Sequence, residues 1–361
     1  MSLEQQLREQ VAIRLAAVLD DTQDRFASVS PLVPAFLAPA RTLAAGGKRM
    51  RAILMMTGYR AAQPIGGTLP APVIQAGVAL ELFQAAALVH DDIIDASDTR
   101  RGKPATHAQF ATDAPADSLE NPRVFGTNAA ILLGDLLLVL ADQAARSAID
   151  RAGSEAANSA RAIWEEMTSE VAIGQYLDVV NSTLPLHSLA PSDALAAALR
   201  VVRHKSARYS VEHPLALGAA LAGGCPSLIA ALRKVGAPLG EAFQLRDDVL
   251  GVYGDPERTG KPSGDDLREG KRTALIALAR KSADSDARSL LERHVGDREM
   301  STETVAVLQK IITESGAYDA HEALIQARLD RALDALEGAS LPEDAARALR
   351  AHARSLAHRS A

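Results

Sequence analysis

Apolar residues recur at intervals of three and four along almost the whole chain, and this spacing restricts the fold more than any other feature. Segments such as LEQQLREQVAIRLAAVL, VIQAGVALELFQAAALVHDDIID and SDALAAALRVVRHKSARYSV keep it over several turns. The spacing matches one face of an α-helix, and the alternation typical of strands is hardly present. Aromatic residues make up only 3% of the chain, which also favours packed helices over sheets. The sequence therefore predicts an all-α protein.

The domain organisation follows from the absence of an obvious linker. No low-complexity segment or short-period repeat divides the 361 residues, so we expect a single all-helical domain over 1–361. Proline and glycine predict irregular structure over 98–127 and 251–271. The apolar window NAAILLGDLLLVLADQ is interrupted by Asp135 and Asp142, which favours a core helix over a transmembrane segment. The charged amphipathic start lacks a secretory hydrophobic region, so a cytoplasmic location is expected.

Composition excludes several classes of site. The net charge of −6 is mild and argues against a surface that coats nucleic acid. The single cysteine, Cys225, excludes an intramolecular disulfide framework and a cysteine-based zinc site. The candidates that remain are built from carboxylates and from arginine and lysine.

The segment ALVHDDIIDASDTRRGKPATH ends an apolar helix in a cluster of aspartates. Asp91 and Asp95 are four residues apart, so on a helix their side chains project from nearly one face, about 6 Å apart. Two such carboxylates repel each other, and the helix dipole also disfavours negative charge at this end. Magnesium prefers oxygen ligands of this kind, completed by substrate phosphates and water. A solvated acidic helix end is the alternative, but a second pair at the end of AFQLRDDVLG, Asp247 and Asp248, favours metal binding.

Basic residues narrow the choice of substrate. The segment GGKRMR places Lys48, Arg49 and Arg51 beside glycines at a helix start, where phosphate oxygens bind readily. Each basic segment alone is typical of a solvated surface. Together with two acidic pairs, they suit a site for two phosphate esters, one bound through magnesium and one directly. The other basic candidates are Arg100, Arg101, Lys205, Lys261 and Lys271.

These segments resemble, in their order, those of the trans-isoprenyl diphosphate synthases. The resemblance rests on GGKRMR, ELFQAAALVHDDIID, DTRRGKPATH, GQYLD, HKSA, FQLRDDVLG and GKPSGDDLREGKRT, between about residues 40 and 275. The chain is most similar to the bacterial geranylgeranyl diphosphate synthases. The resemblance implies an isoprenoid-synthase-type bundle of antiparallel helices around a deep central cavity, normally a homodimer. It also implies magnesium-dependent head-to-tail (1′-4) condensation of isopentenyl diphosphate with dimethylallyl, geranyl or farnesyl diphosphate.

The resemblance further assigns roles to residues. It implies three magnesium ions, two held by Asp91 and Asp95 and one by Asp247, with Asp92, Asp248 and Asp266 in support, directly or through water. The allylic diphosphate would contact Arg100, Lys205, Gln244 and Lys261. Isopentenyl diphosphate would bind Lys48, Arg51 and Arg101, and Gln175 and Lys271 match further polar positions of the family.

Two positions depart from the family pattern. Gln84 stands where many members have histidine, and a glutamine donates hydrogen bonds to phosphate but carries no charge. Gly251 stands where a third aspartate is common, and Asp255, the next acid, lies four residues further along and need not reach the site. Neither departure removes a residue of the expected ligand set.

Product length is predicted from the helix that precedes Asp91. Ala86 and Ala87 lie about one turn before it, roughly 6–7.5 Å along the axis. In the family, bulky aromatic residues here stop growth at fifteen carbons, so alanines imply a product of twenty carbons or more, with geranylgeranyl diphosphate favoured. Packing alone is the alternative role of the alanines, and Phe83 is one candidate for the cavity floor.

Other functions remain as alternatives. A longer- or shorter-chain polyprenyl synthase fits the same motifs. A class I terpene cyclase is disfavoured because DDVLGVYGD lacks the second motif of that class, and a non-catalytic partner subunit is disfavoured by the intact acids and lysines. His90 is expected to pack and not to bind metal, since magnesium prefers oxygen.

Overall fold

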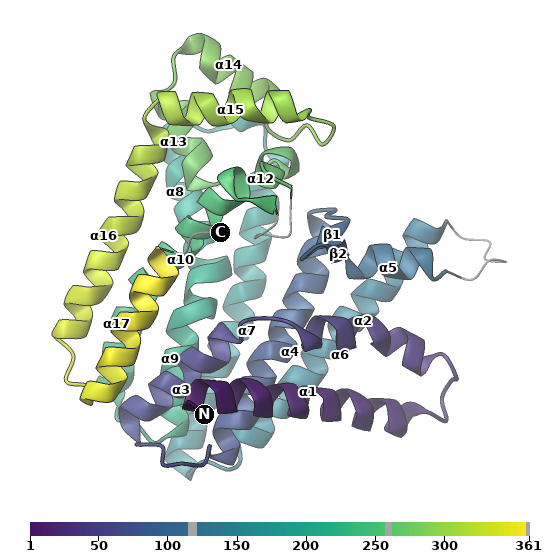
Figure 1. Ribbon diagram of the computed structural model, residues 1–361, viewed down its shortest axis with the longest axis vertical. Coiled ribbons are helices and arrows are strands. Elements are labelled where there is room, and N and C mark those ends of the chain that lie inside the picture. The colour runs from purple at the N-terminus through teal and green to yellow at the C-terminus, as the bar shows by residue number, and fades with distance from the viewer. Residues whose placement is uncertain (115–120, 257–261, 359–361) are drawn as a thin grey trace. The chain divides into compact units, whose positions relative to one another are not determined.

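The computed structural model of the protein describes residues 1–114, 121–256 and 262–358 (Figure 1). Within these ranges the secondary structure is helical apart from two strands of two residues each, which confirms the predicted all-α class. The chain forms two compact units, Met1–Trp164 with Pro214–Ile229 and Glu165–His213 with Ala230–Ala361. The single domain expected over 1–361 stays a prediction.

The first unit is built around the long helix α4 (Ala71–Ile94). Its sequence is apolar on nearly all sides, and such a helix is stable only when neighbours cover it. Side chains on several faces, such as Val73, Leu80 and Val89, are fully buried. The neighbours that pack on α4 are α1 (Leu3–Phe26), α2 (Val33–Ala45), α3 (Met50–Ala62), α5 (Thr106–Thr112) and α6 (Pro122–Ile149).

Two glycines bring α3 into backbone contact with α9 (His213–Leu221). A Cβ atom on Gly58 would lie 2.0 Å from the carbonyl oxygen of Leu215, and one on Gly218 would lie 1.8 Å from that of Met55. Any other residue at either position would force the helices apart. The contact therefore fixes α3, at whose start the GGKRMR segment lies.

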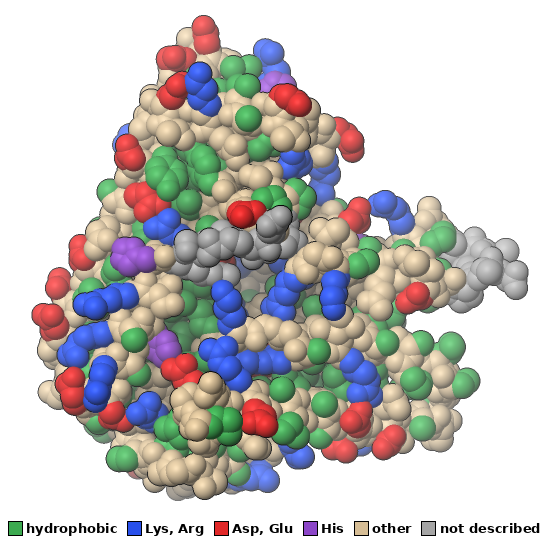
Figure 2. Space-filling model, viewed as in Figure 1, with side chains coloured by type: hydrophobic (Ala, Val, Ile, Leu, Met, Phe, Trp, Pro, Cys, Tyr) green, Lys and Arg blue, Asp and Glu red, His purple; other side chains and the backbone are tan. Residues whose placement is uncertain are grey.

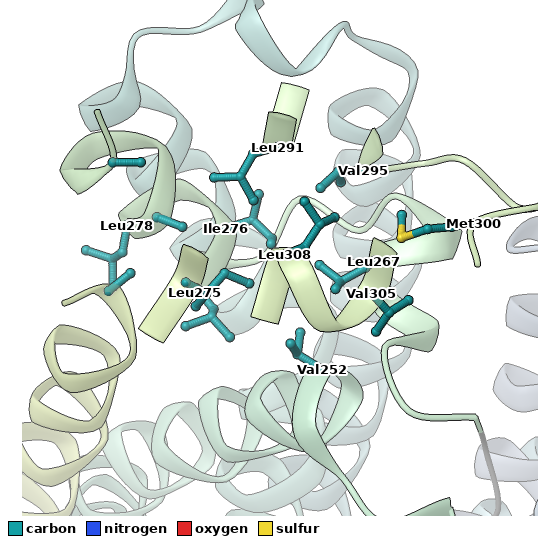
Figure 3. Close-up of a cluster of buried hydrophobic side chains, with 14 residues drawn as sticks. Val252, Leu267, Leu275, Ile276, Leu278, Leu291, Val295, Met300, Val305 and Leu308 are labelled. Atoms are coloured by element: carbon teal, nitrogen blue, oxygen red, sulfur yellow. The ribbon is translucent and has the colours of Figure 1, made fainter. Parts of the chain in front are cut away.

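The second unit has a core centred on α13 (Ala274–Ser282). Leu275, Ile276 and Leu278 of this helix form a buried cluster with Leu291 and Leu308 (Figure 3). The remaining elements of the unit are the later part of α7 (Ser154–Thr183), the short 3-10 helix η1 (Leu186–Ser188), α8 (Pro191–Val201), η2 (Val202–Glu212), most of α10 (Pro226–Tyr253), α12 (Asp265–Glu269), α14 (Ser285–His294), α15 (Thr302–Glu314), α16 (Ala317–Glu337) and α17 (Glu343–Ala357).

One helical prediction differs in geometry from the structure. The spacing of residues 192–211 predicts one α-helix, whereas α8 passes into the π-helix η2 after Val201. A π-helix is wider by about one residue per turn, and apolar spacing over three turns does not resolve this difference. π-Helical turns are frequent at functional sites, and η2 carries Lys205.

Helices α4 and α6 are long and apolar enough, by length and composition alone, to cross a membrane. Inside the molecule, 61% of the most apolar window of α4 and 39% of that of α6 are buried. Core helices that do not cross a membrane also have this length and apolar composition. The interpretation of the α6 window as a core helix stays a prediction.

Candidate active site

The first acidic cluster lies where α4 ends, in the first unit. The backbone N–H of Asp95 donates to the carbonyl of Asp91 at 2.8 Å, so the helical turn continues through Asp95. Ala96 then takes a left-handed conformation, with φ of 48°, and ends the helix. Asp91 and Asp95 are half-buried, whereas Asp92 is buried. The expected pair thus shares one helix face, and Asp92 lies apart from it in the interior.

Arg100 reaches the cluster from a β-hairpin. Strands β1 (Thr99–Arg100) and β2 (Lys103–Pro104) pair with Arg100 opposite Lys103. The two turn residues, Arg101 and Gly102, both have positive φ, 53° and 71°, as a tight hairpin turn requires. The Arg100 guanidinium donates to Asp92 Oδ1 from Nε at 2.9 Å, and its Nη2 lies 3.8 Å from Asp91 Oδ2. Arg100 therefore orders the acidic cluster as well as supplying positive charge beside it.

The basic residues predicted to bind isopentenyl diphosphate lie near one another in the same unit. The Arg101 guanidinium packs on the backbone of Gly46 and Gly47, within 3.2 Å and 3.6 Å of where their Cβ atoms would be, and Lys48 follows, exposed, at the start of α3. Lys and Arg side chains are visible near the β1–β2 hairpin in Figure 2.

The charges of this basic group act on one another. Burial of the guanidinium, followed by repulsion from Arg100, lowers the pKa of Arg101; Arg49 and Arg51 add to the repulsion and Glu81 opposes it. A site in which cations depress one another's pKa values stabilises a bound anion.

Sequence reasoning missed the role of Arg49 and Glu81 in this group. Arg49 is buried and Glu81 is largely buried, and Arg49 Nη1 lies 2.8 Å from Glu81 Oε2. Arg49 also adopts a left-handed conformation, with φ of 53°, directly before α3. The ion pair ties the GGKRMR segment to α4. No spacing rule could have found it, because the two residues are far apart in the sequence.

The second acidic cluster lies on α10, in the second unit. Asp248 is buried; its Oδ1 accepts from Gln244 Nε2 at 3.1 Å, and its Oδ2 has no hydrogen-bond partner. Burial raises the pKa of Asp248 well above its usual range, and repulsion from Asp266 and Asp247 raises it further. A buried carboxylate oxygen that has no hydrogen-bond partner and lies among other acids would be stabilised by a bound cation.

Gly251 explains how a third acid joins this cluster. A Cβ atom on Gly251 would lie 1.9 Å from Asp266 Oδ2, so the Asp266 carboxylate occupies the space beside the α10 backbone. Lys271 Nζ holds that carboxylate at 3.3 Å from Oδ1 and lies 2.9 Å from Glu269 Oε2. Asp266, from α12, therefore supplies a carboxylate where a side chain at position 251 would lie, and this compensates for the absence of a third aspartate in α10.

Lys205 and Gln175 lie in the second unit, on η2 and α7. Lys205 Nζ forms an ion pair with Asp178 Oδ2 at 2.6 Å. A Cβ on Gly174 would lie 2.4 Å from the Lys205 backbone nitrogen, so the two helices touch at this point. Asp178, the last residue of GQYLD, is a further residue of the candidate site, since it fixes Lys205. Lys261 lies outside the described residues.

A charged cluster that sequence reasoning missed lies nearby in the same unit. Carboxylate oxygens of Glu166 and Glu170 and a ring nitrogen of His213 lie within 4.8 Å of one another, as metal ligands do. Arg208 already lies 2.7 Å from Glu166 and 2.6 Å from Glu170, and Arg233 lies 2.6 Å from Glu166. These arginines supply the charge that a metal ion would bring, so the geometry favours a structural ion-pair network.

Helix α4 also carries the residues predicted to set product length. Ala86 is fully buried and Ala87 half-buried, whereas Gln84 is half-buried two turns before Asp91. The ring of Phe83 meets that of Trp164 edge to face, with centroids 6.0 Å apart, and both side chains are buried.

His90 packs as expected. A Cβ on Gly134 of α6 would lie 2.2 Å from its ring, so the imidazole rests on the α6 backbone. Its Nε2 lies 3.4 Å from the Ile131 carbonyl oxygen and 3.6 Å from Asp135. This histidine is part of the contact between α4 and α6.

The donor sets at both acidic clusters fit magnesium. They consist of hard carboxylate oxygens, the ligands that magnesium prefers, and phosphate and water usually complete its coordination. The partnerless Oδ2 of Asp248 and the crowded Asp266 carboxylate beside Gly251 are two features that a bound cation would stabilise. The residues that would hold the ions are Asp91, Asp95 and Asp247, with Asp248 and Asp266 beside Asp247.

Comparison with known proteins gives consistent matches. The polyprenyl synthetase family model matches residues 33–313. The chain is 31% identical over 303 residues to the geranylgeranyl diphosphate synthase of Mycobacterium tuberculosis, which covers 83% of this chain and 78% of that protein. It is 32% identical over 302 residues to the geranylfarnesyl diphosphate synthase of Aeropyrum pernix, with 83% and 86% covered. A geranylgeranyl pyrophosphate synthase from Corynebacterium glutamicum, solved with isoprenyl diphosphate and magnesium, superposes with a TM-score of 0.91 at 38% identity, over 99% of this chain and 100% of that one.

Proposed function

This chain belongs to the polyprenyl synthetase family, and we propose that it is a geranylgeranyl diphosphate synthase. It is a trans-prenyltransferase that makes trans-prenyl diphosphates. In the proposed reaction, isopentenyl diphosphate adds head to tail to dimethylallyl, geranyl and then farnesyl diphosphate. The observation that carries the proposal is the Asp248–Asp266 pair beside Gly251. It supplies an acidic cluster on α10 and α12 in addition to that at the end of α4.

The acidic residues bind the allylic diphosphate in this proposal. Asp91, Asp95 and Asp247 would hold three magnesium ions, supported by Asp248 and Asp266. When bound, these ions neutralise the diphosphate and make it a better leaving group. Arg100, Lys205, Gln244 and Lys261 contact the same diphosphate and stabilise the charge that it gains as its bond to carbon breaks. Asp92 and Asp178 orient Arg100 and Lys205 through the ion pairs that they form.

The basic group of the first unit binds the second substrate. Lys48, Arg51 and Arg101 hold isopentenyl diphosphate directly, since phosphate oxygens accept hydrogen bonds from guanidinium and ammonium groups. Gln84, Gln175 and Lys271 are further polar residues for the two substrates. The double bond of isopentenyl diphosphate attacks C1 of the allylic substrate, and the departing diphosphate accepts the proton that is then lost. Apolar side chains must keep water from the allylic cation during this step.

Product length is assigned to α4. In this proposal the small side chains of Ala86 and Ala87 do not block a growing chain one turn before Asp91. The Phe83–Trp164 ring pair, about 12 Å from Asp91 along the helix, would stop it. We therefore assign a C20 product, with a longer chain as the alternative if these rings do not form the floor.

The proposed enzyme is a cytoplasmic homodimer. Helix α6 exposes a row of large apolar side chains, Val124, Ile131, Leu132 and Val139, of which Leu132 is 61% exposed. These positions recur at helical spacing on one side of the helix, and an apolar row of this kind is stabilised when a second copy covers it.

Product analysis tests the proposed function. The purified protein is incubated with magnesium, radiolabelled isopentenyl diphosphate and each allylic diphosphate in turn, and the products are sized after removal of phosphate. We expect incorporation that depends on magnesium and ends at twenty carbons. Failure to consume isopentenyl diphosphate with any starter would refute the proposal, and a longer product would refute only the assigned length.

A further inference from the structure

Helix α12, which carries Asp266, is only five residues long and lies beside the last turns of α10. Its Asp266 carboxylate approaches acids of α10: burial, then repulsion from Asp266 and from Asp247, raises the pKa of Asp248 well above its usual range. Lys271 offsets part of this repulsion, but it follows α12 directly in the chain and so moves with it. A short helix in this position therefore needs contacts with other helices to hold it against α10.

Helix α15 supplies such contacts within the second unit. Gly264, the residue before α12, has φ of 75°, and a Cβ atom there would lie 2.4 Å from Val305 Cγ1 of α15. Arg268 of α12 donates from Nε at 3.1 Å to the carbonyl of Met300, which lies just before α15. Figure 3 shows Val305 in the same buried cluster as Leu267 of α12. The position of α12 therefore depends on that of α15.

The side chain of Gln309 extends this contact from α15 to α10. Its Nε2 donates to the Val252 carbonyl at 2.6 Å and to Ser263 Oγ at 3.1 Å. Val252 lies in the last turn of α10, where carbonyl groups have no partner within the helix, so the amide satisfies one of them. One side chain thus bridges the residue that follows Gly251 and a residue three positions before Asp266.

A second contact holds the end of α10 on α15 independently of this amide. The Tyr253 hydroxyl donates to the backbone carbonyl of Gln309 at 3.0 Å and lies 3.0 Å from Thr313 Oγ1. The Tyr253 ring also meets that of Tyr318 edge to face. Loss of the Gln309 amide should therefore shift α12 relative to α10 and leave the packing of α10 on α15 in place.

We propose that Gln309 is a positioning residue for the metal site at the second acidic cluster, because its amide holds the segment before Asp266 on the end of α10. Gln309 itself does not belong to the acidic cluster. Groups that orient metal ligands from outside the ligand set alter metal affinity or activity by roughly 10–100-fold when they are removed. The inference rests on the proposed function, which assigns Asp247, Asp248 and Asp266 to magnesium.

Magnesium titrations of the full chain with inorganic diphosphate test the proposal without measuring turnover. The thermal midpoint is followed as magnesium is added, and the concentration that gives half of the full shift is compared between variants. Gln309→Met keeps the length of the side chain but removes both donated hydrogen bonds, so this concentration should rise about tenfold. Ser263→Ala removes one acceptor and leaves the bond to Val252, so the rise should be smaller.

Two comparisons distinguish positioning from a general loss of stability. Gln326→Met is the matched control, because this exposed glutamine donates within α16, to Asp330 Oδ1 at 2.7 Å, and its magnesium dependence should equal that of the unmodified protein. In an Asp266→Asn background, Gln309→Met should cause no further rise, because residues that act through one group are not additive. In steady-state kinetics Gln309→Met should lower kcat and leave the KM for isopentenyl diphosphate unchanged, since the basic group lies in the first unit.

The outcomes separate this inference from the proposed function. A purely structural role would lower the thermal midpoint without magnesium and leave the half-saturating concentration unchanged. That result in Gln309→Met, or in Ser263→Ala if Gln309→Met does not fold, would overturn the inference. So would an equal rise in the Asp266→Asn background, or the absence of any magnesium-dependent shift in the unmodified protein. If the unmodified protein shows the shift but consumes no isopentenyl diphosphate, the proposed function fails and the titrations still decide the role of Gln309.

Discussion

Replacing Gly251 tests whether Asp266 serves as the missing third acid of the α10 cluster. In Gly251→Ala the new Cβ would lie 1.9 Å from Asp266 Oδ2, where real contacts stay beyond 3.0 Å, so the carboxylate must move by about 1 Å. A displacement of this size at a reacting centre costs on the order of 100-fold in rate. Alanine is also the better helix former, by about 1 kcal/mol, so stability should be kept or raised. We therefore expect a loss of turnover without a loss of folding.

Steady-state kinetics over a range of magnesium concentrations measures this loss. The variant should need more magnesium and show a lower kcat, while its thermal midpoint stays at or above that of the unmodified protein. Gly153→Ala is the control, because nothing lies within 4 Å of a Cβ there. Unchanged kcat and magnesium dependence in Gly251→Ala would refute the role of Asp266.

A double replacement sharpens the same test. Gly251→Asp should be impaired at least as much as Gly251→Ala, since it adds a fourth acid to Asp247, Asp248 and Asp266. Combining it with Asp266→Gly removes the clash and supplies the acid from α10 itself, so activity should recover above that of Gly251→Asp alone. Absence of recovery would show that the Asp266 position cannot be replaced from α10.

Four further predictions follow from other parts of the molecule. Asp91→Ala should abolish turnover and leave the circular dichroism melting curve nearly unchanged, because the side chain is at a helix end; retained activity would remove Asp91 from the metal ligands. Phenylalanine at Ala86 or Ala87 should shorten the product in a sizing assay, and at the fully buried Ala86 it should also cost about 1–3 kcal/mol of stability; an unchanged product from both would exclude this wall as the determinant. Burial alone would raise the pKa of Glu170, but hydrogen bonds from His213, His204 and Arg208 lower it from 4.5 to about 2. This carboxylate's contribution is therefore complete above about pH 5 and is lost as the pH falls toward 2, so denaturant titrations should show roughly 2–3 kcal/mol of acid destabilisation that Glu170→Gln lacks. Leu132→Glu should convert a dimer into a monomer by light scattering, whereas a dimer that persists would exclude the exposed row on α6 as the interface.

The sequence predicts well those features that depend on local spacing. The all-α class follows from apolar periodicity, and the carboxylates of Asp91 and Asp95 share a face because a helical turn joins them. The ordered motifs identify the family. The approach of Arg101 to Gly46 and Gly47, by contrast, depends on a hairpin turn in which Arg101 and Gly102 both have positive φ. Of these two residues, only Gly102 indicates such a conformation in the sequence.

The residues that sequence reasoning missed are those whose role depends on a partner from another helix. Glu81 matters because Arg49 is buried against it, and Asp178 matters because Lys205 donates to it. Position 251 is a further example, because the sequence shows that a carboxylate is absent there. It does not show that Asp266, from another helix, occupies the space. Spacing along one helix predicts which face of that helix a side chain occupies. A binding site is formed by side chains from several helices, whose relative positions the spacing does not give.

The π-helix η2 shows how ion pairs with other helices orient the side chains of a candidate site. Lys205 and Arg208 are three residues apart on it, and both form ion pairs with α7, with Asp178 in one case and with Glu166 and Glu170 in the other. Glu212 at the end of the same helix accepts from Arg208 at 2.9 Å and from Arg233 of α10 at 3.1 Å. Because these ion pairs are partly buried, breaking one leaves a charge uncompensated at a cost of several kcal/mol, so they fix the rotation of η2 about its axis. That rotation determines where Lys205 points. The ion-pair network therefore fixes the position of one lysine that we propose for the allylic diphosphate site.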